Sequence, residues 1–445
     1  MSARVVILGG GFAGAYCAAA LERLLPESAE IVLIDRNNYF VFYPLLIEAG
    51  TGRLEPRHTV VPLRAFLQRA AFRMAEVTGI DRSAGKLYYQ LPGDGSSMSL
   101  HYDHLVIALG SVTRLPSLPG LHEYGFEMKS LADAVRLRDR AIQALEIADA
   151  TRDLERRQML LSFVVVGANF TGAELAGELN AFLTEASAHY PNVRASDRRV
   201  TLVELSDRIL SALDPELSEY AIRQMERRGV RVLVNSTVTA ILADRVRMTD
   251  GSDTLCSTVI WCAGIAPNPL IRRLGLPVDP RGYLLCRRDL RIEGEENIWG
   301  IGDCAVNLDA AGQPYPATAQ HALREGQFLA RNLARVLQGA SPLPCDIQSR
   351  GALAALGCRS AVARVFGIKL SGFPAWFLWR TYYLLRMPGL VRKIRVAVDW
   401  TLDLLFEPNY VQLGIHRPAP GASSPPAAAP EAEVSAGQPR RAGGR

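Results

Sequence analysis

Near the start of the chain, an apolar strand ends in a glycine-rich turn that opens a helix. Residues 4–8 (RVVIL) precede the turn GGGFAG, and helix-forming residues follow at 15–24. In the pattern G-x-G-x-x-G, Gly9 makes the tight turn, Gly11 lets a pyrophosphate approach the backbone, and Gly14 allows close packing of helix against strand. The helix start adds free N–H groups and a positive dipole end for the phosphates.

A second apolar strand, 30–34, ends in Asp35, whose carboxylate is placed to accept a hydrogen bond from a ribose hydroxyl. A glycine pattern alone also fits many tight turns that bind nothing. Strand, turn, helix and acid in this order favour a dinucleotide-binding unit and an α/β fold.

The same arrangement occurs a second time. A strand at 161–166 leads into the turn GANFTG, a helix begins at Ala173, and the next strand, 199–203, ends in Glu204. A carboxylate there accepts a bond from a 2′-hydroxyl and repels a 2′-phosphate, so we expect NADH rather than NADPH. The middle glycine is replaced by Asn169, whose Cβ narrows the approach of a pyrophosphate. A degenerate copy that binds no nucleotide is the alternative, but the complete strand–turn–acid order favours binding.

Composition narrows the setting of these two units. The 445 residues are 49% hydrophobic and 21% charged, which suits several buried cores and not a disordered chain. The net charge of +5 gives no reason to expect a nucleic-acid partner. The seven cysteines form no C-x-x-C pair, so we expect no disulfide framework, no dithiol redox motif and no metal site. We also expect neither a signal peptide nor a membrane-spanning helix.

Charge is distributed unevenly along the chain. The stretch 347–398 contains nine basic residues and no acidic one. It predicts two helices, one opened by Pro374 and interrupted at 387–389, and a second, amphipathic one from Leu390. The first of these helices carries an aromatic cluster, formed by Trp376, Trp379, Tyr382 and Tyr383.

Two interpretations fit this stretch. In one, the helix pair packs its apolar face on the protein and leaves a basic face in solvent. In the other, it anchors the protein on a membrane, with aromatic residues at headgroup depth and Arg and Lys facing anionic lipid. The lack of acids and the aromatic cluster favour the membrane over both packing and nucleic acid. Residues 418–445, rich in Pro, Ala and Gly, predict a disordered tail.

Three further segments resemble motifs of flavoproteins that have two dinucleotide-binding domains. Residues 102–111 (YDHLVIALGS) resemble the strand that ends in A-T-G, with Leu109 in place of Thr. Residues 261–264 (WCAG) resemble the matching strand end of the second domain, and 297–303 (NIWGIGD) resemble the motif whose Asp hydrogen-bonds the ribityl chain. The resemblance implies FAD in the first unit and NADH in the second.

Within this superfamily, the sequence resembles the type II NADH dehydrogenases, which are single-subunit NADH:quinone oxidoreductases, over about residues 4–413. Residues 35–46 (DRNNYFVFYPLL) resemble their segment under the flavin, and 317–322 (ATAQHA) resemble the motif where flavin and quinone meet. Residues 167–179 (GANFTGAELAGEL) resemble their nucleotide-domain turn, and the block 367–413 resembles their membrane-anchoring region.

The resemblance implies a role for individual residues. Gln320 lies beside flavin and quinone and Glu174 near the nicotinamide, as the two catalytic candidates; without the resemblance, each is an ordinary residue at a helix start. The implied FAD contacts are Gly9, Gly11, Phe12, Ala13, Gly14, Asp35, Arg36, Pro44, Leu45, Ala108, Gly110, Gly302, Asp303, Ala319 and Gln320. The implied NADH contacts are Gly167, Asn169, Phe170, Thr171, Gly172, Glu174, Glu204, Ala263 and Gly264.

The sequence thus predicts an α/β protein with two Rossmann-like domains and a C-terminal amphipathic helical membrane-anchoring region. The expected bounds are 1–115 and 276–345 for the FAD domain, 116–275 for the NADH domain and 346–417 for the membrane region. The implied activity is transfer of a hydride from NADH to FAD and of two electrons to a membrane quinone, without proton pumping. The implied place is the cytoplasmic face of the cell membrane, as a peripheral protein on anionic lipid, with a homodimer left open.

Two rival functions also fit the sequence. Sulfide:quinone oxidoreductases share the flavin, the quinone and the membrane, and they need separated cysteines on the substrate side of the flavin; Cys358 is the one candidate here. A non-catalytic NADH-sensing flavoprotein is the other rival, if Asn169 has cost the second unit its turnover.

Overall fold

The computed structural model describes residues 3–93, 95–348 and 351–414. Residues 1–413 form one compact body, which contains every element named below. Residues 414–445 form a separate body. The predicted disordered tail, 418–445, lies outside the described residues.

The first glycine turn belongs to a parallel five-stranded sheet. Its strand order is β21 (Ile298–Gly300), β9 (His104–Ile107), β1 (Arg4–Leu8), β2 (Glu30–Asp35) and β5 (Ala71–Met74). The four residues 5–8 of β1 are all buried, as a parallel strand covered on both faces requires, which explains its continuous apolar run. Strand β21 comes from far downstream, so this sheet combines two distant parts of the chain.

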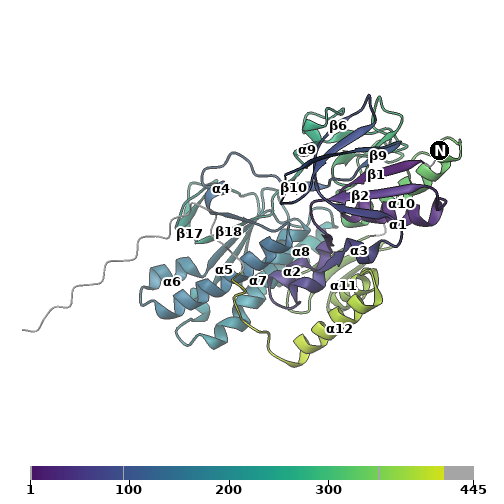
Figure 1. Cartoon of the computed structure of the whole chain (residues 1–445). Helices are drawn as coiled ribbons and strands as arrows, with labels where there is room; N and C mark the ends of the chain where they lie inside the picture. Colours follow the sequence, from purple (N-terminus) through teal and green to yellow (C-terminus); the bar gives the residue numbers. More distant parts are fainter. Residues whose placement is uncertain (1–2, 94, 349–350, 415–445) are drawn as a thin grey trace, which may run out of the picture. The chain divides into compact units, whose positions relative to one another are not determined.

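Two helices lie side by side next to this sheet, α1 (Phe12–Leu24) and α10 (Ala319–Leu337) (Figure 1). Gly326 of α10 makes their close approach possible, because a Cβ there would lie 2.2 Å from the carbonyl oxygen of Ala13. An antiparallel sheet of β6 (Glu76–Asp81), β7 (Lys86–Gln90) and β8 (Ser97–His101) completes this part.

The second glycine turn belongs to another parallel five-stranded sheet. Its order is β11 (Gly125–Glu127), β18 (Thr258–Trp261), β12 (Ser162–Val166), β13 (Arg199–Val203) and β14 (Val230–Leu233). Its main helices are α5 (Leu131–Ala150), α7 (Phe170–Ala186) and α8 (Pro215–Arg227), and a small antiparallel sheet comprises β15 (Val238–Ile241), β16 (Arg245–Met248) and β17 (Asp253–Leu255).

Short elements connect these parts. The antiparallel pair β10 (Ser111–Thr113) and β19 (Ile265–Pro267) lies where the chain passes between the two large sheets. Outside the C-terminal region, the remaining α-helices and strands are β3 (Tyr39–Val41), α2 (Leu46–Gly50), β4 (Val60–Pro62), α3 (Leu63–Phe66), α4 (Leu121–Tyr124), α6 (Leu154–Leu160), α9 (Leu270–Arg273), β20 (Leu284–Leu285) and β22 (Ala305–Val306).

The C-terminal region contains both predicted helices, α11 (Phe373–Arg386) and α12 (Leu390–Leu405), separated by the predicted break at 387–389. Pro374 lies in the first turn of α11, as predicted. The sequence did not predict the antiparallel sheet that precedes them, formed by β23 (Gly351–Ala355), β24 (Ala361–Val365) and β25 (Ile368–Gly372). This sheet packs against α11, and α12 packs against α11 in turn.

The orientation of α12 separates the two interpretations of this region. Its buried residues are Val396 and Trp400, and Asp403 on the same side forms ion pairs with Arg53 and Arg380. The apolar residues on the other side are exposed, and they are Leu390, Val391, Ile394, Val398, Leu402 and Leu405. The helix therefore contacts the protein through two buried residues and ionic groups and turns its apolar stripe outward, contrary to the first interpretation.

Candidate functional site

Both glycine turns open into one cavity of about 1410 Å³. Its lining includes residues 9–13 of the first turn, 169–171 of the second, the segment 302–303 and the start of α10. It also includes Tyr382 and Tyr383 of α11. A single cavity thus joins both nucleotide units to the C-terminal region.

The first turn has the shape that a pyrophosphate needs. Gly9 has φ +101° and its Cβ would lie 2.3 Å from the Ala108 carbonyl oxygen, and a Cβ on Gly14 would lie 1.9 Å from the oxygen of Gly9. A Cβ on Gly11, in contrast, would meet no atom within 4 Å, and Gly11 lines the cavity. No side chain caps α1 at Gly11, so its first N–H groups are available to a phosphate. These residues fit the pyrophosphate of FAD.

Asp35 lies beside this turn at the end of β2. Its Oδ2 accepts a hydrogen bond from the Gly10 N–H at 2.7 Å, and its Oδ1 accepts one from the Asn37 N–H at 2.7 Å. Burial raises the pKa of this carboxyl, and the two backbone donors oppose the rise. Asp35 therefore lies next to the phosphate turn, where a ribose partner is required.

The second turn accommodates Asn169 without strain. Asn169 has φ −67° and ψ −173°, close to the −72° and −164° of Gly11, so no left-handed conformation is needed. Its Nδ2 donates to the Cys262 carbonyl oxygen at 2.8 Å, and its Oδ1 accepts from the Gly172 N–H at 3.1 Å. Asn169 is therefore the N-cap of α7, and it occupies one N–H group that the first turn leaves available.

Glu204 stands in the second unit where Asp35 stands in the first. Its Oε2 accepts from the Ala168 N–H at 2.6 Å, and its Oε1 accepts from the N–H and hydroxyl of Ser206. Burial alone would raise the pKa of Glu204, but these hydrogen bonds outweigh it and lower the pKa. The group is thus ionised at neutral pH, as discrimination against a 2′-phosphate requires.

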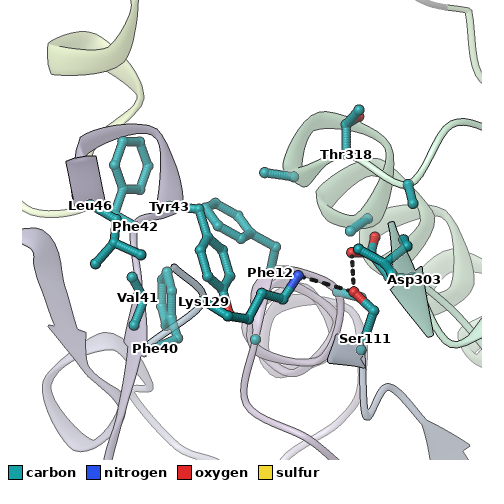
Figure 2. A pocket seen from close by; sticks show the side chains of 18 of the residues that line it. Phe12, Phe40, Val41, Phe42, Tyr43, Leu46, Ser111, Lys129, Asp303 and Thr318 are labelled. Atoms are coloured by element: carbon teal, nitrogen blue, oxygen red, sulfur yellow. Dashed lines mark hydrogen bonds between the residues drawn. The ribbon is translucent and has the colours of Figure 1, made fainter. Parts of the chain in front are cut away.

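A chain of polar side chains crosses the cavity between the two units (Figure 2). Lys129 Nζ donates to the Ser111 hydroxyl at 3.1 Å, and that hydroxyl donates to Asp303 Oδ2 at 3.0 Å. Lys129 Nζ also lies 5.2 Å from the centre of the Tyr43 ring. Burial lowers the pKa of Lys129, and the charge of Asp303 opposes this. The sequence did not indicate Lys129, which belongs to no motif. Ser111 ends the segment 102–111, but that resemblance implied no role for it.

The catalytic candidate Glu174 lies in the second turn of α7 and lines the cavity. Its Oε1 accepts hydrogen bonds from the Ala355 N–H at 2.9 Å and from the Trp379 indole N–H at 3.2 Å. Burial raises the pKa of Glu174 to about 8, so the carboxyl keeps its proton at neutral pH. Its partners belong to the C-terminal region, which the sequence did not indicate.

Gln320, the other catalytic candidate, lies with Ala319 in the first turn of α10, and both line the cavity. The side chain of the N-cap Thr318 accepts from the His321 N–H, so Gln320 is not needed as the helix cap. Most of the other predicted contacts also line the cavity. The lining omits six predicted residues, which are Gly14, Leu45, Gly167, Gly172, Glu204 and Ala263.

The residues that line the cavity also test the sulfide:quinone oxidoreductase alternative and the expectation that no metal is bound. Its lining contains no cysteine within the described ranges, and Cys358 is an exposed free thiol outside it. In the part of the chain that the structure describes, no group of three or more His, Cys, Asp or Glu could hold a metal ion. The geometry therefore offers no pair of cysteines for sulfide chemistry.

Comparison with known proteins agrees with this site. The family model described as pyridine nucleotide-disulphide oxidoreductase matches residues 3–326, and the NDH2 C-terminal domain matches residues 350–407. A demethylphylloquinone reductase of Synechocystis is 36% identical over 406 residues, which are 89% of this chain and 95% of that protein. A type II NADH:quinone oxidoreductase of Mycobacterium tuberculosis is 30% identical, over 90% of this chain and 88% of that protein.

A solved structure of NDH2 from Plasmodium falciparum in complex with NADH has the same fold. The TM-score is 0.85 at 18% sequence identity, over 92% of this chain and 100% of that chain. Two dinucleotide-binding sheets around one cavity define a flavin-dependent pyridine nucleotide oxidoreductase. The chain belongs to the pyridine nucleotide-disulphide oxidoreductases and, among them, to the type II NADH dehydrogenases. This membership confirms the predicted fold, enzyme class and cofactors, FAD and NADH.

Proposed function

We propose that this protein is a peripheral membrane enzyme that oxidises NADH and reduces a membrane quinone. The observation that carries the proposal is the single cavity, because it brings both nucleotide turns, Gln320 and the aromatic residues of α11 together. Curated relatives at 30–36% identity are named as quinone reductases, which supports the acceptor. FAD supplies the chemistry when bound, since it takes a hydride from a nicotinamide and releases electrons to a second acceptor.

The protein's own residues bind and orient the partners. The N–H groups at the start of α1 hold the FAD pyrophosphate, while Asp35 holds a ribose hydroxyl and Asp303 the ribityl chain. In the second unit, residues 169–172 hold the NADH pyrophosphate and Glu204 reads its ribose. With this division, the first unit would bind FAD and the second NADH at the same cavity, so that orientation rather than acid–base chemistry is the main task of the protein.

Quinone reduction also consumes protons, and two residues of the cavity can serve it. The Gln320 amide can donate a hydrogen bond to a quinone carbonyl. The Glu174 carboxyl holds a proton at neutral pH and can release it towards the cavity. Trp379, which is 2% exposed, covers Glu174 on the side of α11 and keeps water away from it.

Membrane attachment follows from the outer surface of the helix pair. Besides the stripe on α12, the exposed apolar residues of this surface include Phe373, Phe377 and Leu385 of α11. Arg392, Lys393 and Arg395 lie on the same helix as the apolar stripe. The described helices include none that is both long and apolar enough to cross a bilayer. An interfacial helix pair on anionic lipid, at the cytoplasmic face, is the arrangement that suits these features.

A steady-state assay tests the proposal. Purified protein with bound FAD should reduce a short-chain quinone with NADH and not with sulfide as the donor. Loss of NADH-dependent turnover in a flavin-loaded protein would remove the proposal, and sulfide turnover abolished by Cys358→Ser would favour the rival. A homodimer is proposed only from the family resemblance, and light scattering of the purified protein tests it.

A further inference from the structure

Glu325 is a buried acid close to the cavity that the proposed reaction does not use. It lies in the second turn of α10 and is 4% exposed. Its Oε2 accepts two hydrogen bonds, from the Gly302 N–H at 2.6 Å and from the Asn307 side-chain amide at 2.8 Å. The carboxyl therefore supports, from the side of α10, the turn that precedes Asp303.

This turn is tightly enclosed, so its support matters for the position of Asp303. Gly302 has φ +73°, and a Cβ there would lie 3.0 Å from the Ala13 Cβ of α1. The Asn307 amide also donates to the Gly300 carbonyl oxygen at the end of β21, at 3.3 Å. Glu325 and Asn307 together connect the strand end to the turn, which leaves the Asp303 side chain facing the cavity.

The groups around Glu325 leave its charge unbalanced. Asp303 in the turn is an acid, and its charge acts on Glu325. The thiols of Cys286, Cys304 and Cys345 feel the charge of Glu325 from the neighbouring segments, and α1 contributes the buried thiol of Cys17 close to Gly326. None of these groups is a cation. On its own helix, the nearest titratable neighbours in sequence are His321, one turn before it, and the cation Arg324, whose guanidinium donates a hydrogen bond to the Gln348 carbonyl oxygen.

Burial raises the pKa of Glu325 to about 7, against the effect of its two hydrogen-bond donors. Among the described residues, no cation forms an ion pair with Glu325. A buried negative charge without such a partner opposes the arrival of further negative charge nearby. A group that titrates near neutral pH makes this opposition depend on pH.

We propose that Glu325 is a positioning residue of the flavin site, whose buried carboxyl fixes the Gly302–Asp303 turn and, when ionised, lowers the reduction potential of the bound FAD. This inference rests on the proposed function, since it needs FAD at Asp303. It assigns to the protein a pH-dependent electrostatic control that adds to the pH dependence of flavin reduction itself.

The test compares wild type with Glu325→Gln by measuring the midpoint potential of bound FAD against pH. The glutamine Oε1 can replace Oε2 and keep both hydrogen bonds, while the charge is lost. We expect equal potentials at about pH 5.5, where both side chains are neutral, and a higher potential in Glu325→Gln at about pH 8.5. Glu178→Gln, a buried acid of α7 in the other nucleotide unit, serves as the matched control and should follow wild type.

A second variant keeps the test valid if Glu325→Gln does not fold. Asn307→Ala removes one hydrogen-bond donor from the Glu325 carboxylate and leaves Glu325 in place. The pKa of Glu325 should therefore rise, and the pH at which its ionisation lowers the FAD midpoint potential should be higher than in wild type. Identical curves for wild type and Glu325→Gln, both with FAD bound, would overturn this inference alone. A difference in midpoint potential between wild type and Glu325→Gln that does not change with pH would also overturn it, because such a difference would reflect altered geometry without titration of Glu325. A wild-type protein that takes up no FAD would overturn the proposed function as well.

Discussion

The indole N–H of Trp379 donates a hydrogen bond to the Glu174 carboxyl across 3.2 Å, and the Ala355 N–H donates to the same oxygen at 2.9 Å. Glu174 belongs to a helix of the second nucleotide unit, and both donors belong to the C-terminal region. The region that carries the outward apolar surface thus also forms a wall of the cavity. In the proposed function, attachment to the membrane and access of a quinone to the site therefore depend on the same segment.

The protonation of Glu174 predicts a pH-dependent stability. Its pKa is raised from 4.5 to about 8 in the folded state, so the folded protein holds more protons between these values and loses stability as the pH rises through this window. Glu174→Gln removes this loss, and its gain over wild type should grow up to about pH 8, on the order of 5 kcal/mol at most. Urea unfolding at several pH values measures this. Glu219→Gln, whose side chain is 69% exposed on α8, is the control, and a gain of Glu174→Gln that is independent of pH would contradict the assignment.

The ion pairs of Arg53 are expected to stabilise the attachment of α12 to the rest of the protein. Its guanidinium contacts Glu178 at 3.1 Å, Glu185 at 2.8 Å and Asp403 of α12 at 3.1 Å, and its side chain is 15% exposed. Arg53→Met leaves the buried Glu178 carboxylate and the partly buried Asp403 carboxylate without this partner, and it should lower the free energy of unfolding by about 3–5 kcal/mol.

Denaturant unfolding, with tryptophan fluorescence as the signal, measures the effect of Arg53→Met. Arg57→Met is the matched control, because the Arg57 side chain is 85% exposed and its ion pair with Glu55 is worth at most about 1 kcal/mol. Equal losses in the two variants would show that the Arg53 cluster does not hold α12.

The apolar stripe of α12 predicts membrane binding. Leu390, Ile394 and Leu405 are 73%, 54% and 71% exposed, and each contributes about 1.5 kcal/mol if lipid buries it. The triple replacement by Gln should therefore weaken binding to anionic vesicles by about a hundredfold or more. Co-sedimentation measures it, with Leu154→Gln/Leu205→Gln as the control, because these residues are equally exposed elsewhere. Undiminished binding of the triple variant would refute the anchor.

Glu204 predicts the choice of nucleotide. Both Glu204→Gln and Glu204→Ala remove the charge that repels a 2′-phosphate. Glu204→Gln still offers a side-chain oxygen to the Ala168 N–H, so it changes the charge with less change to the turn. We expect the ratio of kcat/KM for NADH over NADPH to fall about tenfold or more in both variants. An unchanged ratio would show that Glu204 does not read the ribose.

The features that the sequence could predict are those specified by a local pattern of residues. Each glycine turn, with its strand, helix and acid, is specified within about 40 residues, so both nucleotide units could be located. The break between α11 and α12 was predicted because proline and glycine act locally. The sheet β23–β25 was missed because its first strand, GALAA, is composed of residues with low strand propensity.

Other features depend on contacts between distant segments. Lys129 and Ser111 meet only when the two units fold around one cavity, and a single lysine between a strand and a helix carries no motif. The sequence placed Asp399 and Asp403 on one side of α12 and the leucines on another, but which side faces the protein depends on Arg53, 350 positions away from Asp403. Glu174 had a predicted ligand, while its hydrogen-bond partners lie 181 and 205 residues downstream.

The central claim is that one flavin in this cavity passes electrons from NADH to a quinone, and anaerobic spectroscopy of the two half-reactions tests it most directly. Purified protein should show the oxidised FAD spectrum, lose it on addition of NADH, and regain it on addition of a quinone. Gln320→Ala should slow the second step more than the first. A protein that binds FAD but is not bleached by NADH, or is bleached and not reoxidised by quinone, would contradict the account.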